Sequence, residues 1–155
     1  MTDLSDLLTP EAVASALPVA NKKNLFLQLG AVAARAYELD AKLVSERLAA
    51  REKLGSTGFG GGIAIPHAKI EGLKQVIAIV ARLPQPIDFA AVDELPVDLV
   101  FALLSPVDAG AEHLKALARV SRRLRDRNFA AKLRGAGSPD ALYALLTGVE
   151  ARDAA

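Results

Sequence analysis

The residues Gly55-Ser56-Thr57-Gly58-Phe59-Gly60-Gly61-Gly62-Ile63-Ala64-Ile65-Pro66-His67 form the most informative stretch of this chain. Five glycines within eight residues lead into a short apolar strand that ends in Pro66 and His67. Glycine allows backbone conformations that other residues avoid, and successive N–H groups can bind an anion. Ser56 and Thr57 add hydroxyl donors, and neutral imidazole is a nucleophile at pH 7. The stretch therefore predicts a loop that holds a phosphoryl group beside His67.

Two familiar phosphate-binding motifs do not fit this loop. A Walker loop needs Lys and Ser/Thr after its last glycine, whereas Gly60 is followed by two more glycines. The dinucleotide fingerprint follows a strand and opens a helix, whereas this loop is expected after a helix and before a strand. For a glycine-rich loop alone, the alternative interpretation is a tight connection in which His67 is only a partly exposed residue.

Two helices are predicted on the N-terminal side of the loop. Asn21 is a typical N-cap for the first helix, and Asp40 can cap the second. Gly55 follows the second helix, where a left-handed cap residue belongs. Val13–Val19 is predicted as a short edge strand, because Pro18 excludes it from the centre of a sheet. The apolar positions of the two helices are Leu25, Leu29, Val32, Ala36 and Leu39, then Leu43, Val44, Leu48 and Leu54.

Short apolar runs rich in β-branched residues occupy the middle of the chain. They are residues 63–65, 76–81 and 97–104, and their continuous apolar character indicates strands buried on both faces. Between the last two runs, Leu83–Phe89 contains two prolines and is predicted as a turn segment with limited capacity for a strand.

The last third of the chain returns to helical spacing. A helix near Asp108 carries one apolar face, and after a break at residues 126–128 the pattern continues with Phe129 and Leu133. Ser138 and Pro139 open a final helix as N-cap and first helical residue. Helices, then strands, then helices predict a three-layer α/β/α sandwich. The apolar faces of the first and last of these helices are Leu114, Leu117, Ala118, Ser121 and Leu124, then Leu142, Leu145 and Leu146.

Length and composition narrow the possible classes of protein. The 155 residues predict one domain with a core at about residues 4–147 and a frayed C-terminal tail. A net charge of +1 gives no electrostatic footprint for nucleic acid and no polybasic segment for a membrane surface. Cysteine is absent, which excludes disulfides and thiolate metal sites. No signal sequence or membrane-spanning run is apparent, so a cytoplasmic protein is expected.

The chain resembles the fructose/mannitol class of enzyme IIA proteins of the bacterial phosphoenolpyruvate-dependent phosphotransferase system. The loop and its Pro-His ending carry the resemblance, which extends from about Leu4 to Leu146. Within that class the chain is most similar to the nitrogen-type enzyme IIA, although Gly61 stands where the family often has Asn. The other segments that match are residues 51–54, 86–89 with Asp93, 97–101 and 109–118.

The resemblance implies a fold, a reaction and partners. The fold would be an α/β/α sandwich around a mixed sheet, with the active histidine at its edge. His67 would accept phosphate on Nε2 from a histidine phosphocarrier of the HPr type, without any cofactor. In the nitrogen branch, the phosphorylation state controls binding to targets such as potassium-transport systems, sensor kinases and the stringent-response synthetase.

The resemblance also assigns supporting residues. His113 matches the second histidine of the family and would support His67, whereas by itself it would be a surface residue of a helix. Arg51 would stabilise the phosphate charge, because its planar guanidinium suits phosphoryl oxygens; otherwise it is an exposed residue at a helix end. Two histidines could bind a metal, but no third His and no Cys support this, so no metal is expected.

Further candidates lie around the same loop. Ser56, Thr57 and Gly58 are expected to bind phosphate, although the hydroxyls could simply cap the loop. Phe59 is predicted to be exposed beside His67 and to help dock the phosphocarrier, and a Phe59 facing the core is the competing interpretation. Glu112 could orient an imidazole or be a solvated charge. The arginines at positions 119, 122, 123, 125 and 127 form a solvated face that could contact an acidic partner.

Two other functions stay open from the sequence. The chain could be a sugar-specific enzyme IIA that passes phosphate to a IIB component. It could also be a binding module that is not phosphorylated, although the presence of His67, Arg51 and His113 argues against this. The oligomeric state and the downstream target do not follow from the sequence.

Overall fold

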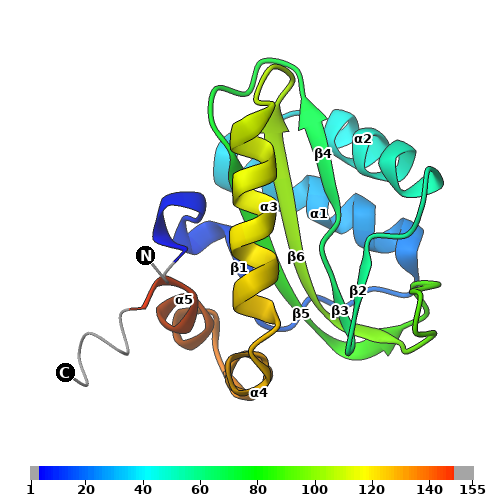
Figure 1. The fold of residues 1–155 in the computed structure, drawn as a ribbon, viewed down its shortest axis with the longest axis vertical. Coiled ribbons are helices and arrows are strands. Elements are labelled where there is room, and N and C mark those ends of the chain that lie inside the picture. Colours follow the sequence, from blue (N-terminus) through cyan, green and yellow to red (C-terminus); the bar gives the residue numbers. More distant parts are fainter. Residues whose placement is uncertain (1–3, 149–155) are drawn as a thin grey trace.

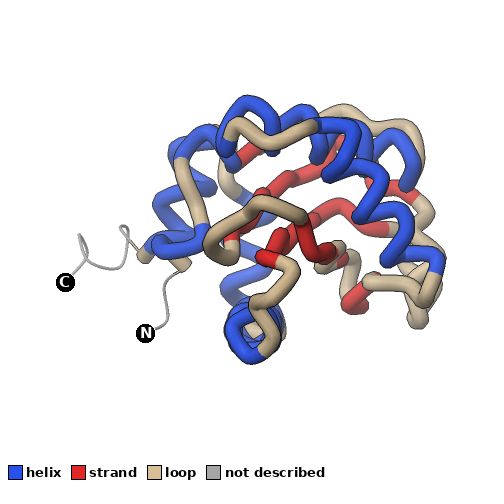
Figure 2. The backbone as a smooth tube through the Cα atoms, turned by 90° about the horizontal axis from the view of Figure 1, so that it is seen from above, coloured by secondary structure: helices blue, strands red, loops and turns tan. Residues whose placement is uncertain are grey.

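A mixed β-sheet lies between two layers of helices in the computed structural model (Figure 1), which describes residues 4–148. Helices α1 (Lys22–Tyr37) and α2 (Ala41–Lys53) cover one face. Helix α3 (Ala111–Leu124) covers the other, and α4 (Arg127–Gly135) and α5 (Pro139–Thr147) follow it. Figure 2 shows the same layers from above. The predicted α/β/α sandwich is confirmed.

Strand β6 (Val97–Pro106) is the centre of the sheet. It pairs antiparallel with β5 (Ile77–Ile87) on one side. On the other side it pairs in parallel first with β3 (Ile63–Ala64) and then with β4 (His67–Ile70). The edges are β1 (Val13–Ala14), parallel to β5, and β2 (Gly58–Gly60), antiparallel to β3. Two short 3₁₀ helices, Ser5–Leu7 and Pro10–Ala12, precede β1.

The helix starts are the local features that the sequence predicts best. The Asn21 side chain accepts the Asn24 N–H at 2.8 Å, and Asp40 accepts two N–H groups of the first turn of α2. Asp126 caps α4 after the expected break. Ser138 caps α5 with Pro139 in the first turn. Each cap satisfies backbone donors that the helix itself cannot pair, so the signal is local.

The end of α2 differs from the prediction. Leu54 is 84% exposed and does not contribute to the core. The Leu54 and Gly55 N–H groups bond to the carbonyls of Arg51 and Glu52, so a tighter turn ends the helix. Gly55 has φ +155°, a value that favours glycine but lies outside the left-handed helical region of a cap residue.

Two predictions about strands are wrong in extent. The expected turn segment Leu83–Phe89 continues β5 as far as Ile87. The pairing register with β6 shifts between Arg82 and Ile87, and both prolines in that interval are exposed. Because regular pairing is interrupted there, the N–H groups that the prolines lack are not needed for hydrogen bonds to β6. The predicted strand at Val13–Val19 is an edge strand, but only its first two residues pair.

His67 begins a strand rather than ending one. The sequence predicts one apolar strand at residues 63–65, whereas the chain forms β3, passes through the buried Ile65 and Pro66, and re-enters the sheet as β4. His67 lies opposite Leu103 of β6. Because β4 pairs only with β6, His67 lies at an edge of the sheet.

The face that helix α3 buries overlaps only in part with the predicted one: Leu124 is buried and Leu117 packs against the core, but Leu114 and Ala118 are exposed. Its buried residues are Ala116, Val120 and Leu124, while Leu114 is 65% exposed. The helix begins at Ala111, near Asp108 as expected, and its N-cap residue Gly110 provides no side-chain cap. Apolar residues occur on both faces, so their spacing alone could not select the one that meets the sheet.

Among residues 4–148, no helix is both long and apolar enough to cross a membrane. The core runs from Leu4 through the sheet to Leu146 and lies on both sides of the central strands.

We expect Gly30→Ala to destabilise the protein. A Cβ at Gly30 in α1 would collide with the carbonyl oxygen of Ala41 in α2, where the two helices cross. Alanine in a helix is favoured over glycine by about 1 kcal/mol, but overpacking against backbone costs about 1–3 kcal/mol, so the clash should prevail. Urea unfolding should show a lower free energy of unfolding. Gly137→Ala, which has nothing within 4 Å of the added Cβ, is the control, and equal stability of the two variants would contradict the packing argument.

Candidate active site at His67

A groove of about 500 Å³ lies at the His67 edge of the sheet, between the C-terminal half of α2 and the start of α3. Three of its lining residues are cationic: Arg47 and Arg51 of α2, and Lys69 of β4. Arg47 is paired with Glu71 at 2.9 Å, so among residues 4–148 Arg51 and Lys69 are the groove cations without a carboxylate partner, and they favour an anion beside the two imidazoles. The remaining lining residues are Ala50, Leu54, His67, Ala68, Glu71, Val107 and His113.

The His67 ring is held in one orientation by the backbone. Its Nδ1 lies 2.8 Å from the carbonyl oxygen of Ile65, two residues earlier. A carbonyl oxygen can only accept, so Nδ1 carries the hydrogen. In the neutral ring the lone pair is then on Nε2, which is the nitrogen left free to act as a nucleophile.

His113 approaches from α3 with the opposite arrangement. Its ring centroid lies 5.5 Å from that of His67, with 53° between the ring planes. Its Nδ1 lies 2.6 Å from the hydroxyl oxygen of Ser105, a fully buried residue of β6. Among residues 4–148 the structure gives that hydroxyl no other hydrogen bond. A buried hydroxyl hydrogen without an acceptor would cost free energy. The hydroxyl therefore donates to Nδ1, which leaves the hydrogen of His113 on Nε2.

Both imidazoles are harder to protonate than a free histidine. Burial lowers the pKa of His67 below its ordinary value of 6.5; the Ile65 carbonyl and Glu52 raise it, and the Arg51 charge lowers it. Burial also lowers the pKa of His113, and the charges of His67, Lys69 and Arg51 lower it further. A pKa below 6.5 makes the neutral form of each ring the predominant one at pH 7, and a neutral imidazole can act as a nucleophile or as an N–H donor.

Glu52 fixes the loop that precedes His67. Its mostly buried carboxylate accepts the Thr57 hydroxyl at 2.6 Å and the Thr57 N–H at 3.1 Å. The same carboxylate forms an ion pair at 2.9 Å with Lys22, at the start of α1. Arg51, one residue earlier, donates to the Gly55 carbonyl at 3.0 Å. Consecutive residues of α2 therefore hold both ends of the turn that enters the loop.

A model of the family described as "Phosphoenolpyruvate-dependent sugar phosphotransferase system, EIIA 2" matches residues 6–149. The chain belongs to this family. A nitrogen regulatory protein of Bradyrhizobium diazoefficiens is 48% identical over 143 residues, which cover 92% of this chain and 94% of that protein. The fructose-specific EIIA component of Haloferax volcanii is 34% identical over 152 residues, covering 96% and 97%.

The same resemblance appears among solved structures. The crystal structure of nitrogen regulatory protein IIA-Ntr from Neisseria meningitidis has a TM-score of 0.85 and 37% identity, covering 92% of this EIIA 2 chain and 97% of that one. The similarity to nitrogen-type enzyme IIA proteins that the sequence motifs indicate is therefore confirmed.

The structure brings three of the predicted residues of this EIIA 2 protein together: His67, His113 and Arg51 line one groove. Sequence reasoning missed Ser105, which lies in an apolar strand and has no motif. It also missed Arg47 and Lys69. Arg47 lies one helical turn before Arg51, so the helical period could have placed it on the same face.

Three of the predicted phosphate-binding donors, the Thr57 hydroxyl and the N–H groups of Thr57 and Gly58, form hydrogen bonds within the protein. The Thr57 hydroxyl and N–H both bond to Glu52, and the Ser56 hydroxyl oxygen accepts the Gly58 N–H at 3.1 Å. Gly58 also lies against Ala91, so that a Cβ would come within 2.5 Å of the Ala91 Cβ. These contacts match the alternative in which the hydroxyls cap the loop. Phosphate binding by the three residues stays a prediction.

Phe59 is not where the sequence places it. It is half-buried against the core and has the Arg125 guanidinium 6.0 Å from its ring centroid, and it does not line the His67 groove. The competing interpretation, a Phe59 turned toward the core, describes this position better. Its contribution to docking stays a prediction.

Nearby partners bear on two other surface predictions, although contact of the arginine face with an acidic partner stays a prediction. Glu112 forms an exposed ion pair with Lys115, so it is a solvated helix charge. In the arginine-rich face, Arg119 pairs with Asp6 at 2.8 Å, and the Arg123 guanidinium lies 3.6 Å from the Phe129 ring centroid. Within residues 4–148, no group of three or more His, Asp or Glu side chains is placed to hold a metal ion.

The lowered pKa of His67 gives a prediction. In an NMR titration, its ring resonances should show a midpoint below pH 6.5, because burial disfavours the imidazolium. Arg51→Gln should move that midpoint upward, because it removes a nearby positive charge, whereas the more remote Arg127→Gln should leave it in place. A midpoint at or above pH 6.5 in the unsubstituted protein would contradict the assigned environment.

Proposed function

We propose that this protein is a regulatory phosphoryl carrier that accepts a phosphoryl group on Nε2 of His67 from an HPr-type histidine phosphocarrier. The observation that carries the proposal is the pair of complementary imidazoles: Nδ1 of His67 bound to the Ile65 carbonyl, and Nδ1 of His113 bound to Ser105. One ring then presents a lone pair and the other an N–H in the same cationic groove.

The chemistry is an in-line transfer between nitrogens. The Nε2 lone pair of His67 forms a bond to phosphorus while the bond from phosphorus to the donor histidine nitrogen breaks, and that nitrogen keeps the electron pair. Negative charge is spread over three phosphoryl oxygens during transfer. Arg51, Lys69 and the Nε2–H of His113 are the groups of this chain available to stabilise it.

An apolar rim beside the groove supports docking of another protein. Leu54 and Val107 line the groove and are 84% and 52% exposed. Leu114, which follows His113 on α3, is also exposed. Exposed apolar side chains around a polar centre are typical of a protein-binding surface. They are better candidates than Phe59 for contact with the phosphocarrier.

Regulation would follow from the charge of the phosphoryl group. Phosphorylation introduces about 1.5–2 negative charges into a groove lined by Arg51, Lys69 and the Arg47–Glu71 ion pair. The electrostatics of the docking surface would therefore differ between the two states. A cytoplasmic target could distinguish them, as expected for the nitrogen-type branch, whose possible targets include potassium transport, a sensor kinase and the stringent-response synthetase.

Incubation with phosphoenolpyruvate, enzyme I and an HPr-type carrier should add one acid-labile phosphoryl group, measured by intact mass. His67→Ala should abolish the addition, because it removes the nucleophile, whereas His113→Gln should slow it while still giving a single site. Addition to the His67→Ala protein would contradict the assignment. Failure of the unsubstituted protein with several carriers would favour the unphosphorylated binding module.

A second candidate is a sugar-specific enzyme IIA, favoured by the similarity to the fructose-specific component of Haloferax volcanii. The phosphorylated protein separates the two functions when it is mixed with a fructose-type or mannitol-type IIB protein. Rapid transfer to IIB would support the sugar-specific role, and retention of phosphate on His67 would support the regulatory one.

Ser105→Ala should slow phosphorylation of His67 by about tenfold, since the loss of one hydrogen bond to His113 corresponds to about 1.4 kcal/mol. Ring ¹⁵N chemical shifts should also show that the hydrogen of His113 is no longer confined to Nε2. Ser45→Ala removes a buried serine hydroxyl from α2 and should change neither quantity. A slower reaction with unchanged His113 tautomer would point to structural damage instead of positioning.

A further inference from the structure

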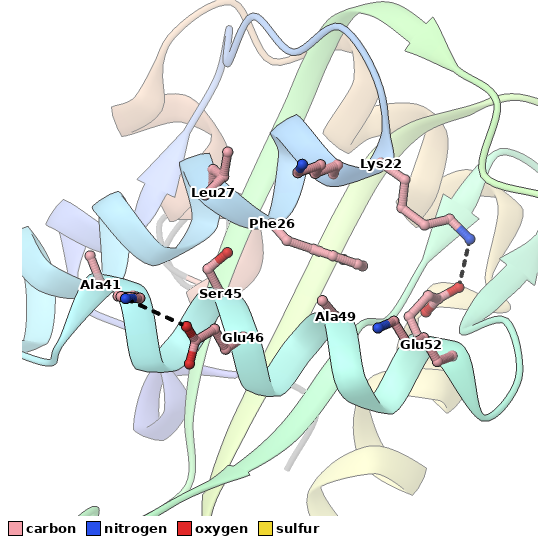
Figure 3. Close-up of a pocket in the computed structure, with 11 residues that line it drawn as sticks. Lys22, Phe26, Leu27, Ala41, Ser45, Glu46, Ala49 and Glu52 are labelled. Atoms are coloured by element: carbon pink, nitrogen blue, oxygen red, sulfur yellow. Dashed lines mark hydrogen bonds and ion pairs between the residues drawn. The ribbon is translucent and has the colours of Figure 1, made fainter.

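A second and larger groove, of about 910 Å³, lies between α1 and α2 and shares no lining residue with the His67 groove. Figure 3 shows Phe26 between the two helices, with Ser45 and Ala49 on the α2 side. Phe26 is buried and packs edge-on against Phe89, with 6.4 Å between ring centroids, so the floor is backed by the core. Leu27 belongs to the lining and is 53% exposed. This is an apolar groove open to solvent.

The rim of this groove is basic. Its charged lining residues are Lys22, Lys23, Lys42, Lys53, Glu46 and Glu52, which sum to a net charge of +2. Glu52 is paired with Lys22 at 2.9 Å and Glu46 with Lys42 at 4.0 Å. Among residues 4–148, Lys23 and Lys53 have no carboxylate partner. Two lysines with unused charge therefore border an apolar floor.

The backbone of α1 adds to the positive electrostatic potential at this rim. Lys22 and Lys23 lie in the first turn, which contains no acidic residue. The N-terminal end of a helix carries partial positive charge, so lysines there are at the unfavourable end of the dipole. An acidic group in this part of the groove would be attracted by both lysines and by the helix terminus.

The shape of the groove favours a helix as the occupant. The α2 residues that line it run from Ala41 to Lys53, about 18 Å at 1.5 Å per residue, the length of three helical turns. Both walls are helices whose backbone groups are already paired, so an extended peptide would find no strand edge to extend. A helix satisfies its own backbone and can place apolar side chains on Phe26 and Ala49.

We propose that the α1–α2 groove is the docking site for an amphipathic helix of a partner protein, with apolar residues facing the floor and acidic residues facing Lys23 and Lys53. The site is separate from the His67 groove, and the two share only helix α2. Its occupation does not depend on phosphorylation of His67, so the proposal stands or falls independently of the proposed carrier function.

A defined peptide tests this assignment. The probe is a 16-residue synthetic helix with leucines at i, i+3, i+4 and i+7 and glutamates on both flanks, titrated into ¹⁵N-labelled protein. Saturable shifts of backbone amides are expected in residues 22–27 and 41–53. A peptide with every glutamate replaced by lysine should bind at least about tenfold more weakly, since two like-charged contacts replace two attractive ones.

Variants of the protein provide the matched comparison. Lys23→Glu combined with Lys53→Glu should weaken binding of the acidic peptide by about tenfold, since both lysines are exposed and unpaired. Leu27→Ser should also weaken it, through loss of apolar contact. Lys74→Glu, outside the groove, is the control. Thermal unfolding of each variant checks that it is folded.

Four outcomes would overturn the proposal. They are no saturable shift at millimolar peptide, equal binding of the acidic and basic peptides, shifts confined to the His67 groove, and shifts of the same amides when the protein is diluted without peptide. The last result would identify a second copy of this chain as the occupant.

Discussion

The rest of the site depends on the carboxylate of Glu52, which connects three parts of the molecule. It belongs to the last turn of α2, it is paired with Lys22 at the start of α1, and it accepts both the N–H and the hydroxyl of Thr57. A largely buried carboxylate is costly unless it is paired and hydrogen-bonded, and here both conditions are met. The glycine-rich loop can therefore be conformationally unusual and still enter the sheet at one defined position.

The path from that loop to His67 explains why one imidazole nitrogen is free. The chain leaves β3, buries Ile65 and Pro66, and returns to the sheet as β4, which places the Ile65 carbonyl against Nδ1 of His67. Strand β6 orients the other histidine, His113, through the hydroxyl of Ser105, which is buried in the sheet. Two chemically identical side chains thus present different Nε2 atoms, because a carbonyl that accepts binds Nδ1 of His67 and a hydroxyl that donates binds Nδ1 of His113.

Helix α2 separates two grooves with different chemistry. One face carries Arg47 and Arg51 toward the two histidines, and another face lines the apolar groove against α1. Glu52 holds the loop that leads to His67 and, with its ion-pair partner Lys22, also lines the apolar groove. The two grooves are therefore separate in position, although one residue of α2 contacts both regions.

Sequence patterns were sufficient to predict the helix starts at Asn21, Asp40 and Ser138, the apolar central strands, the layer order, and the importance of the Gly-rich loop that ends at His67. These features depend on local chemistry: a side chain that caps its own helix, or a run of apolar residues long enough to be a buried strand. The family motifs added His113 and Arg51.

The remaining features depend on residues distant in the chain, so they follow only from the tertiary structure. It continued β5 through two prolines where the pairing with β6 is irregular, and it selected the face of α3 that meets the sheet. It also packed Phe59 against the core and outside the His67 groove, engaged Thr57 with Glu52, and placed Ser105 in contact with His113. A hydrogen bond between β6 and α3 has no signature in the spacing of residues, since its geometry exists only after the helix has packed on the sheet.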